Sequence, residues 1–351
     1  MKIKIKYVFV ILLCCVCFIT ANLILLAGAL SEPMAVQAVQ SEEESVASNG
    51  ACGTDATWEY SGDTNTLTIS GSGAMTSYAY GTAPWYSYAG EINKVVVSDE
   101  ITYISAGAFY GCYSLQEITL PFVGDSRNIS ETVQATKFST WQGGSGNLFG
   151  YIFGGAVKQG TNSSTSDWIY QGQEAFIGPN PYFHKYYDGY YIPASLRKVT
   201  ITDAEGISAN AFYGCTMIEE LNLNDSITTI YDNAFYNCTA LNVFELPRGL
   251  SSLGSGVMQN CDSLRYIELP SQIINIPTYI FYDCDNLLNV KIHDDITTID
   301  EYAFYSCDSL KNVELPEKLE TIGRYAFSEC ESFTEIVIPN SVINIDGFAF
   351  A

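Results

Sequence analysis

Apolar residues recur at a fixed interval of 23 residues through the second half of the chain. Cysteine marks each recurrence, and the residue three before each cysteine is phenylalanine or methionine. The cysteines are Cys215, Cys238, Cys261, Cys284, Cys307 and Cys330; the residues before them are Phe212, Phe235, Met258, Phe281, Phe304 and Phe327, and Phe350 continues the series. Such a period is the signature of a repeat array, in which one short unit is stacked on copies of itself.

Each unit carries further apolar positions after its cysteine. In one unit these are Leu241, Phe244 and Leu246, followed by Leu250 and Leu253. A single unit cannot close a core with these side chains, whereas stacked units can. The pattern therefore predicts a repeat solenoid, mainly parallel β with short helical or 3-10 turns, with strands at Leu221–Leu223, Phe244–Leu246, Ile267–Leu269, Val290–Ile292, Val313–Leu315 and Ile336–Ile338.

The unit AFYSCDSLKNVELPEKLETI, from Ala303 to Ile322, resembles the BspA-type leucine-rich repeat of bacterial and protist surface proteins. That resemblance implies a right-handed superhelix whose LxxIxL segments line a parallel sheet. It also implies that ligands bind on this sheet and that the protein is secreted or displayed on the cell surface.

The first hundred residues differ in composition from the repeats. Residues 1–30, with Lys2, Lys4 and Lys6 before an uncharged apolar run, are predicted to be a signal peptide or signal anchor. Residues 31–50 are predicted to be an acidic linker, and 51–97 a cap with a first irregular coil. In the cap, TWEYSGDTNTLTISG predicts a β-hairpin, followed by a short helix near Pro84–Tyr88 and a strand at Lys94–Val97.

The array is predicted to occupy 98–351, with an insertion at about 122–195. Leu115 and Leu196 occupy the same repeat position 81 residues apart, which we interpret as two coils plus an insertion. The piece LFGYIFGG at Leu148–Gly155 is similar to a degenerate Ala-Phe segment. The flanks around Trp141–Ser145 and Thr161–Ser166 are typical of exposed loops. Such loops are either mobile decorations that bind no ligand or recognition sites.

The charge of the chain and its lack of catalytic motifs exclude several classes of function. The formal net charge is −23, and loss of the three signal lysines would make the exported part more acidic still, so nucleic acid and anionic lipid are poor partners. Neither a metalloprotease, nucleophile-elbow nor phosphate-loop motif occurs, and the two histidines, His184 and His293, lie far apart in the sequence. We therefore expect no enzyme activity and no cofactor, and contact with a membrane only through a retained N-terminal anchor.

The cysteines follow the core period and are not spaced like a disulfide framework. Stacked equivalents would lie roughly 5 Å apart, within the Cα range of a disulfide, but their side chains would point in parallel into the core. We expect them to be reduced, buried and unreactive.

Three exposed series are candidate sites. The first follows the cysteines and is either a row of solvated turns or a divalent-cation ladder: Asp262, Asp285, Asp308 and Glu331. The second follows the phenylalanines and is either ordinary packing or a carbohydrate- or protein-binding strip: Tyr110, Tyr213, Tyr236, Tyr282 and Tyr305. The third lies on the outward side of the predicted strands: Glu245, Arg265, Tyr266, Glu268, Lys291, Lys311 and Glu314.

The sequence thus predicts an exported or cell-surface binding protein, with adhesion or recognition of host or matrix protein as its role and a protein or carbohydrate as its ligand. The alternative is a targeting or scaffold region of a larger surface enzyme. The reason for this alternative is that the last residue, Ala351, lies inside an Ala-Phe segment. We therefore expect a further C-terminal part of the protein.

Overall fold

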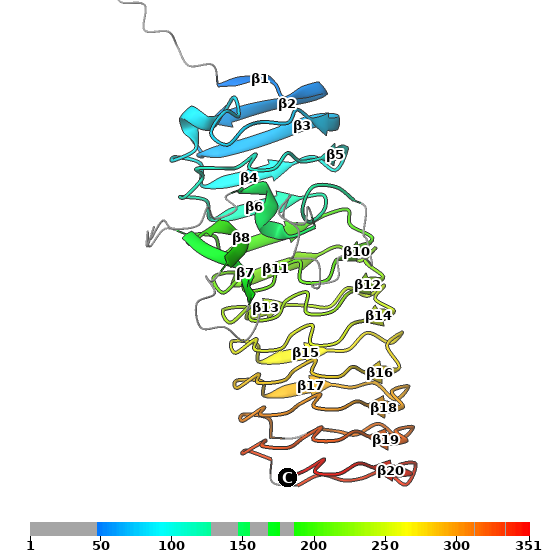
Figure 1. Ribbon diagram of the computed structural model, residues 1–351. Coiled ribbons are helices and arrows are strands. Elements are labelled where there is room, and N and C mark those ends of the chain that lie inside the picture. Colours follow the sequence, from blue (N-terminus) through cyan, green and yellow to red (C-terminus); the bar gives the residue numbers. More distant parts are fainter. Residues whose placement is uncertain (1–47, 128–146, 155–167, 176–185, 312, 334) are drawn as a thin grey trace, which may run out of the picture. The chain divides into compact units, whose positions relative to one another are not determined.

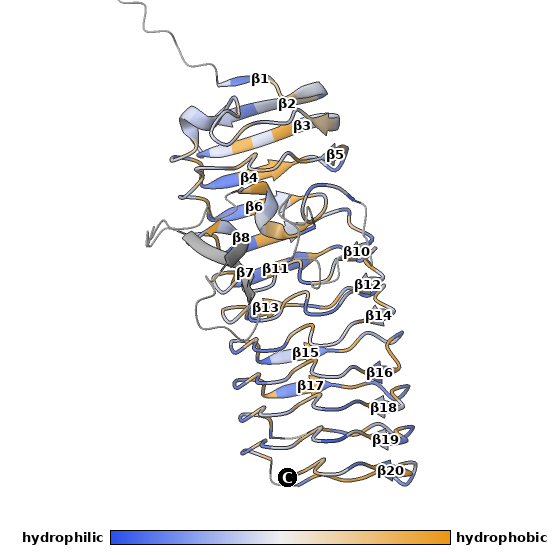
Figure 2. Cartoon of the chain, viewed as in Figure 1, coloured by the Kyte–Doolittle hydropathy of each residue, from blue (hydrophilic) through white to orange (hydrophobic). Residues whose placement is uncertain are grey.

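The computed structural model describes residues 48–127, 147–154, 168–175, 186–311, 313–333 and 335–351. The predicted signal, most of the acidic linker, His184 and the predicted loops Trp141–Ser145 and Thr161–Ser166 lie outside these ranges. Within them, the chain winds into stacked coils, whose strands form a major column and a minor column (Figure 1). Figure 2 shows apolar and polar residues interspersed along the coils.

The major column carries the predicted LxxIxL strands. It contains β4 (Lys94–Val97), β6 (Glu117–Leu120), β9 (Lys198–Ile201), β11 (Glu220–Leu223) and β13 (Val243–Phe244), and after a break β15 (Tyr266–Glu268) and β17 (Asn289–Lys291). All pairings within the column are parallel, and Leu221 faces Phe244 as Ile267 faces Val290, one repeat apart. The predicted parallel solenoid is confirmed at these strands.

The minor column forms from the second apolar pair of each unit. Its strands are β10 (Gly206–Ile207), β12 (Thr229–Ile230) and β14 (Ser252–Leu253), then β16 (Asn275–Ile276), β18 (Thr298–Ile299), β19 (Thr321–Ile322) and β20 (Asn344–Ile345). The predicted strands Val313–Leu315 and Ile336–Ile338 do not form. Strand pairing between the last coils runs through β18, β19 and β20 instead, and the side chain of Val313 is nevertheless buried.

Both columns are interrupted at the same place. The first sheet ends at β13 and the next begins at β15; the minor column likewise ends at β14 and resumes at β16. Across this break the loops stay bonded, since Gly256 and Met258 donate backbone hydrogen bonds to Thr278 and Ile280 at 2.9 and 3.0 Å. At the break the coils therefore remain joined through their loops, while their strands do not pair.

An antiparallel hairpin closes the first end of the stack, as predicted. Its strands are β2 (Gly53–Ser61) and β3 (Thr66–Met75), and β3 then pairs in parallel with β4 and with β5 (Ile101–Tyr103). The 3-10 helix η2 (Tyr86–Tyr88) lies between β3 and β4 in the sequence, close to the predicted short helix. One boundary was wrong: Asn49 and Gly50 belong to the edge strand β1 (Asn49–Ala51) and not to the linker, because their backbone pairs with β2.

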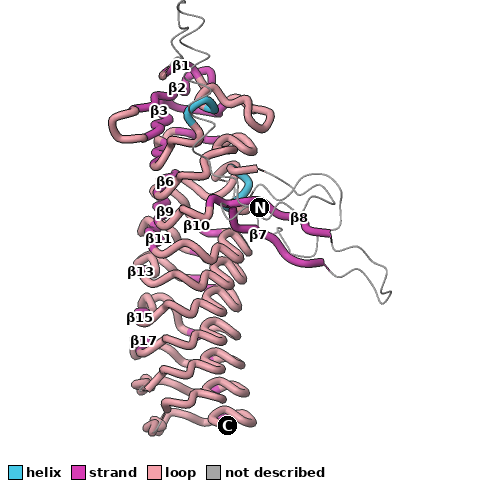
Figure 3. Tube along the Cα trace, turned by 90° about the vertical axis from the view of Figure 1, so that its left-hand side faces the viewer, coloured by secondary structure: helices cyan, strands magenta, loops and turns pink. Residues whose placement is uncertain are grey.

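The inserted region contains one coil, not the predicted two. Strand β6 pairs directly with β9, with Glu117 opposite Lys198, so no further coil separates them. The predicted degenerate segment supplies the loop of this coil: its 3-10 helix η4 (Phe149–Ile152) accepts a hydrogen bond from the Phe109 backbone, and Phe149 donates one to Ala211. The remaining length includes a separate hairpin, β7 (Trp168–Ala175) and β8 (Tyr186–Pro193), which sequence reasoning did not foresee (Figure 3).

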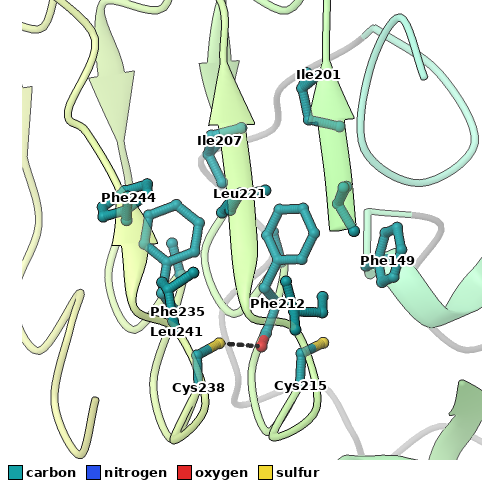
Figure 4. Close-up of a cluster of buried hydrophobic side chains, with 14 of the residues drawn as sticks. Phe149, Ile201, Ile207, Phe212, Cys215, Leu221, Phe235, Cys238, Leu241 and Phe244 are labelled. Carbon is teal, nitrogen blue, oxygen red and sulfur yellow. Dashed lines mark hydrogen bonds between the residues drawn. The ribbon is translucent and has the colours of Figure 1, made fainter. Parts of the chain in front are cut away.

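The core is built from columns of equivalent apolar side chains. Phe304 is fully buried and stacks on Phe281 and Phe327, with ring centroids 5.3 and 5.0 Å apart. Beside the rings runs the cysteine column, in which every thiol after Cys215 donates to the carbonyl oxygen 26 residues earlier; Figure 4 shows the first such bond, from Cys238 to Phe212. The pairs are Cys238–Phe212, Cys261–Phe235, Cys284–Met258, Cys307–Phe281 and Cys330–Phe304, at 3.0–3.3 Å.

All eight cysteines of the described residues are free and buried, as expected. Burial raises the pKa of the Cys261 and Cys284 thiols far above the usual value, because a thiolate would lose its hydration. We therefore expect, on average, less than one of these eight thiols to react with a maleimide in the native protein and all eight to react in guanidinium chloride. Rapid native labelling, counted by mass spectrometry, would contradict a buried column.

Candidate binding surface

The outward residues of the major column form an exposed face. Every member of the predicted set is exposed: Glu245, Arg265, Tyr266, Glu268, Lys291, Lys311 and Glu314. They come from consecutive coils, so equivalent positions lie one above another. Tyr266 leaves 51% of its surface in solvent, the largest aromatic area on this part of the face. The structure thus brings the predicted set together on one side of the stack.

Opposite charges pair across neighbouring coils on this face. Lys291 Nζ lies 2.6 Å from Glu268 Oε1, and this hydrogen bond raises the pKa of the lysine. The same arrangement recurs earlier, at Lys198–Glu220 (2.6 Å) and Lys94–Glu117 (3.1 Å). Sequence reasoning missed these earlier pairs, although the outward positions of the predicted strands could have revealed them. Because the pairs are exposed, each contributes little to stability.

A hollow lies on the face where the major column is interrupted. It is lined by Leu221, Asn222, Leu223, Val243, Phe244 and Glu245. Val243 leaves 53% of its surface exposed there, and Phe244 stands where other coils have leucine, isoleucine or valine. The Phe244 ring packs against Phe235 at 5.1 Å, so the larger side chain is accommodated within its own coil. An apolar spot next to Glu245 and one coil from Tyr266 suits an interface with a charged rim.

The acidic series runs along the turns after the cysteines. The pKa values of Asp262 and Asp285 are raised, chiefly by partial burial and then by repulsion from neighbouring carboxylates, including Asp283. Within the part of the chain that the structure describes, no three histidine, cysteine, aspartate or glutamate side chains are placed to hold a metal ion. These residues thus carry unfavourable charge without a preformed cation site.

The raised pKa values predict a pH dependence of stability. A group whose pKa is raised by folding favours the folded state fully below its ordinary pKa, near 3.8, and this contribution is lost as pH rises through the raised value. At pH 7, Asp262→Asn and Asp285→Asn should each raise the free energy of unfolding slightly, by less than about 1 kcal/mol because solvent screens the charges. Urea titrations at pH 4 and pH 7 test this, with exposed Glu317→Gln as the control; a gain that is equal at both pH values would contradict it.

The tyrosines after the phenylalanines stack in pairs. Tyr213 lies 4.6 Å from Tyr236, and Tyr282 lies 4.9 Å from Tyr305, with rings nearly parallel in both pairs. Tyr110 stacks instead on Tyr80, which belongs to the irregular first coil. A second aromatic series stands two residues before the phenylalanines in the last coils and was missed, although the 23-residue period contains it: Tyr279, Tyr302, Tyr325 and Phe348.

His293 has a local structural role. Its Nδ1 accepts a hydrogen bond from the backbone N–H of Asp295 at 3.2 Å, which fixes the turn after β17. None of the described helices is long and apolar enough to cross a membrane.

Comparison with known proteins gives a match to one family model, described as the BspA type leucine rich repeat region. Six copies match, over residues 83–133, 189–307 and 274–351. No curated protein matches the chain significantly. Solved structures that it resembles include a leucine-rich repeat protein from Eubacterium ventriosum (22% identity, 86% of this chain and 94% of that one, TM-score 0.44). A leucine-rich repeat protein from T. pallidum shares 27% identity over 42% of this chain and 72% of that one, with a TM-score of 0.40.

Proposed function

Because the chain belongs to the family of BspA-type leucine-rich repeat proteins, we propose that it is an exported, non-catalytic protein that recognises a partner through the outward face of its major column. Export is supported by the lysines and the uncharged apolar run of residues 1–30. A binding role is supported by the face itself, where charged and aromatic side chains of successive coils stand in register. The partner we propose is a protein of a host or matrix surface.

The observation that carries this proposal is the cluster around Tyr266. This exposed ring is flanked by Arg265 in the same coil and by the Glu268–Lys291 pair beside it. Tyrosine and arginine are the residue types that most often dominate interface energies. One coil offers too little area for a stable complex, so a partner must span several coils. The acidity of the chain further favours a partner that is basic where it docks.

Replacement of this cluster tests the proposal. The variant Arg265→Ala, Tyr266→Ala and Glu268→Lys should fold normally, since all three side chains point away from the core. Its affinity for a partner captured on an array of matrix proteins should fall about tenfold or more. The matched control is Arg248→Ala with Glu317→Lys, which makes a similar charge change at exposed turn positions. Equal binding by both variants and the unaltered chain, measured by surface plasmon resonance, would contradict the assignment of this face.

A further inference from the structure

Six aromatic side chains form a continuous surface on the loops of the last coils. We call it the aromatic patch; its members are Tyr279, Tyr282, Tyr302, Tyr305, Tyr325 and Phe348. Adjacent rings in each series are nearly parallel, with centroids 4.9–5.1 Å apart. The two series also touch each other, for example at Tyr302 and Tyr305, 5.6 Å apart. The patch thus spans four coils without interruption.

Four of these aromatics stand where the backbone does not favour them. Tyr279, Tyr302, Tyr325 and Phe348 have φ between 56° and 64°, in the left-handed region. Earlier coils place residues suited to this conformation at the same repeat position: Gly107, Asn210, Asn233 and Gly256. A bulky residue with positive φ costs on the order of 1 kcal/mol or more. Backbone strain of this kind is a known feature of recognition sites, and here it recurs in four successive coils.

The rings present an electron-rich surface. Parallel rings at these centroid distances are offset, so each leaves part of its face uncovered by the next. Arg324 already uses one such face: its guanidinium carbon lies 4.9 Å from the centre of the Tyr325 ring. Burial and then neighbouring tyrosines raise the pKa of Tyr282 and Tyr302, and Asp283 and Glu301 respectively add to this. Aromatic faces beside carboxylates attract cations.

We propose that the aromatic patch is a second binding surface, for an arginine-rich polypeptide segment whose guanidinium groups lie over the rings as Arg324 does. Tyr279, at the start of its series, is 37% exposed and gives a partner access to the rings. The charge of the chain, −23, attracts such a segment from a distance. A neutral glycan is a poorer fit, since sugars stack on whole ring faces and these are partly covered by neighbouring rings.

A labelled (Arg-Gly)6 peptide tests the proposal with the full chain, with (Lys-Gly)6, (Gln-Gly)6 and a neutral oligosaccharide as comparison probes. The variant Tyr279→Asn, Tyr302→Asn and Tyr325→Asn places at each site the residue that earlier coils carry there, so its melting temperature should change little. We expect the arginine probe to bind about tenfold more weakly to it. The control Tyr213→Asn with Tyr236→Asn removes a stacked pair outside the patch and should leave binding unchanged.

A second test compares two variants that each lose one arginine charge and keep all the tyrosines. Arg324→Ser frees the Tyr325 ring, whereas Arg248→Ser removes the same charge at an exposed turn. The arginine probe should bind several-fold more tightly to the first variant than to the second. Equal binding to these two variants, undiminished binding to the triple asparagine variant, or preference for the oligosaccharide would each overturn the proposal.

Discussion

Replacing Phe304 by alanine should lower the free energy of unfolding by about 3–5 kcal/mol, the usual range for a buried phenylalanine. The side chain has no exposed surface and stacks on a phenylalanine in the coil on either side. Its loss therefore leaves a cavity that neither neighbour can fill without leaving its own column. In a stacked array the interfaces between coils carry much of the stability, so one truncation weakens two of them.

Tyr305→Ala is the matched control for this prediction. Tyr305 is adjacent in sequence but stacks on the outside of the same loop, half-buried, so its truncation should cost about 1 kcal/mol. Urea denaturation followed by circular dichroism measures both. Hydrogen exchange would further show the loss spreading to the coils of Phe281 and Phe327; a cost for Phe304→Ala no larger than that of the control would contradict the stacked column.

Cys284→Ala should cost about 2 kcal/mol, because it removes a fully buried sulfur atom and the hydrogen bond from its thiol to the Met258 carbonyl oxygen, 3.1 Å away. Cys215 provides the comparison. It is equally buried and begins the column (Figure 4), and among the described residues its thiol has no such carbonyl partner.

Cys215→Ala should therefore be milder than Cys284→Ala by about 0.5–1 kcal/mol, the worth of one modest hydrogen bond. Unfolding by urea under reducing conditions measures the difference. If the two variants lose equal stability, the thiol hydrogen bonds contribute nothing and the cysteines serve only as small apolar side chains.

The repeat positions could be predicted from the sequence because stacking forces equivalent residues into one environment. Ile267 and Val290 had to face each other once their spacing matched the period. The thiol hydrogen bonds could not be predicted in the same way, since they depend on how close the Phe212 carbonyl comes to Cys238, which the spacing does not specify.

The count of coils in the interrupted region could not be predicted either. The 81 residues between Leu115 and Leu196 give only the sum of coil and insertion, and loops of very different length cost similar free energy. The face of the major column was predictable from strand alternation, as the exposed Tyr266 and Glu268 show. The residues before the phenylalanines were not singled out, because nothing in the period requires a loop position such as Tyr302 to be aromatic.

The break after β13 and β14 makes the array a jointed rod in mechanical terms. Strand pairing is interrupted there in both columns while the loops remain bonded through Gly256 and Met258, so fewer backbone hydrogen bonds resist separation of the two blocks there than between coils whose strands pair. Under tension, we expect this joint to open before coils whose strands pair. Opening would separate Glu245 from Tyr266 and divide the face that we propose for binding, so that pulling force would itself weaken the proposed interaction.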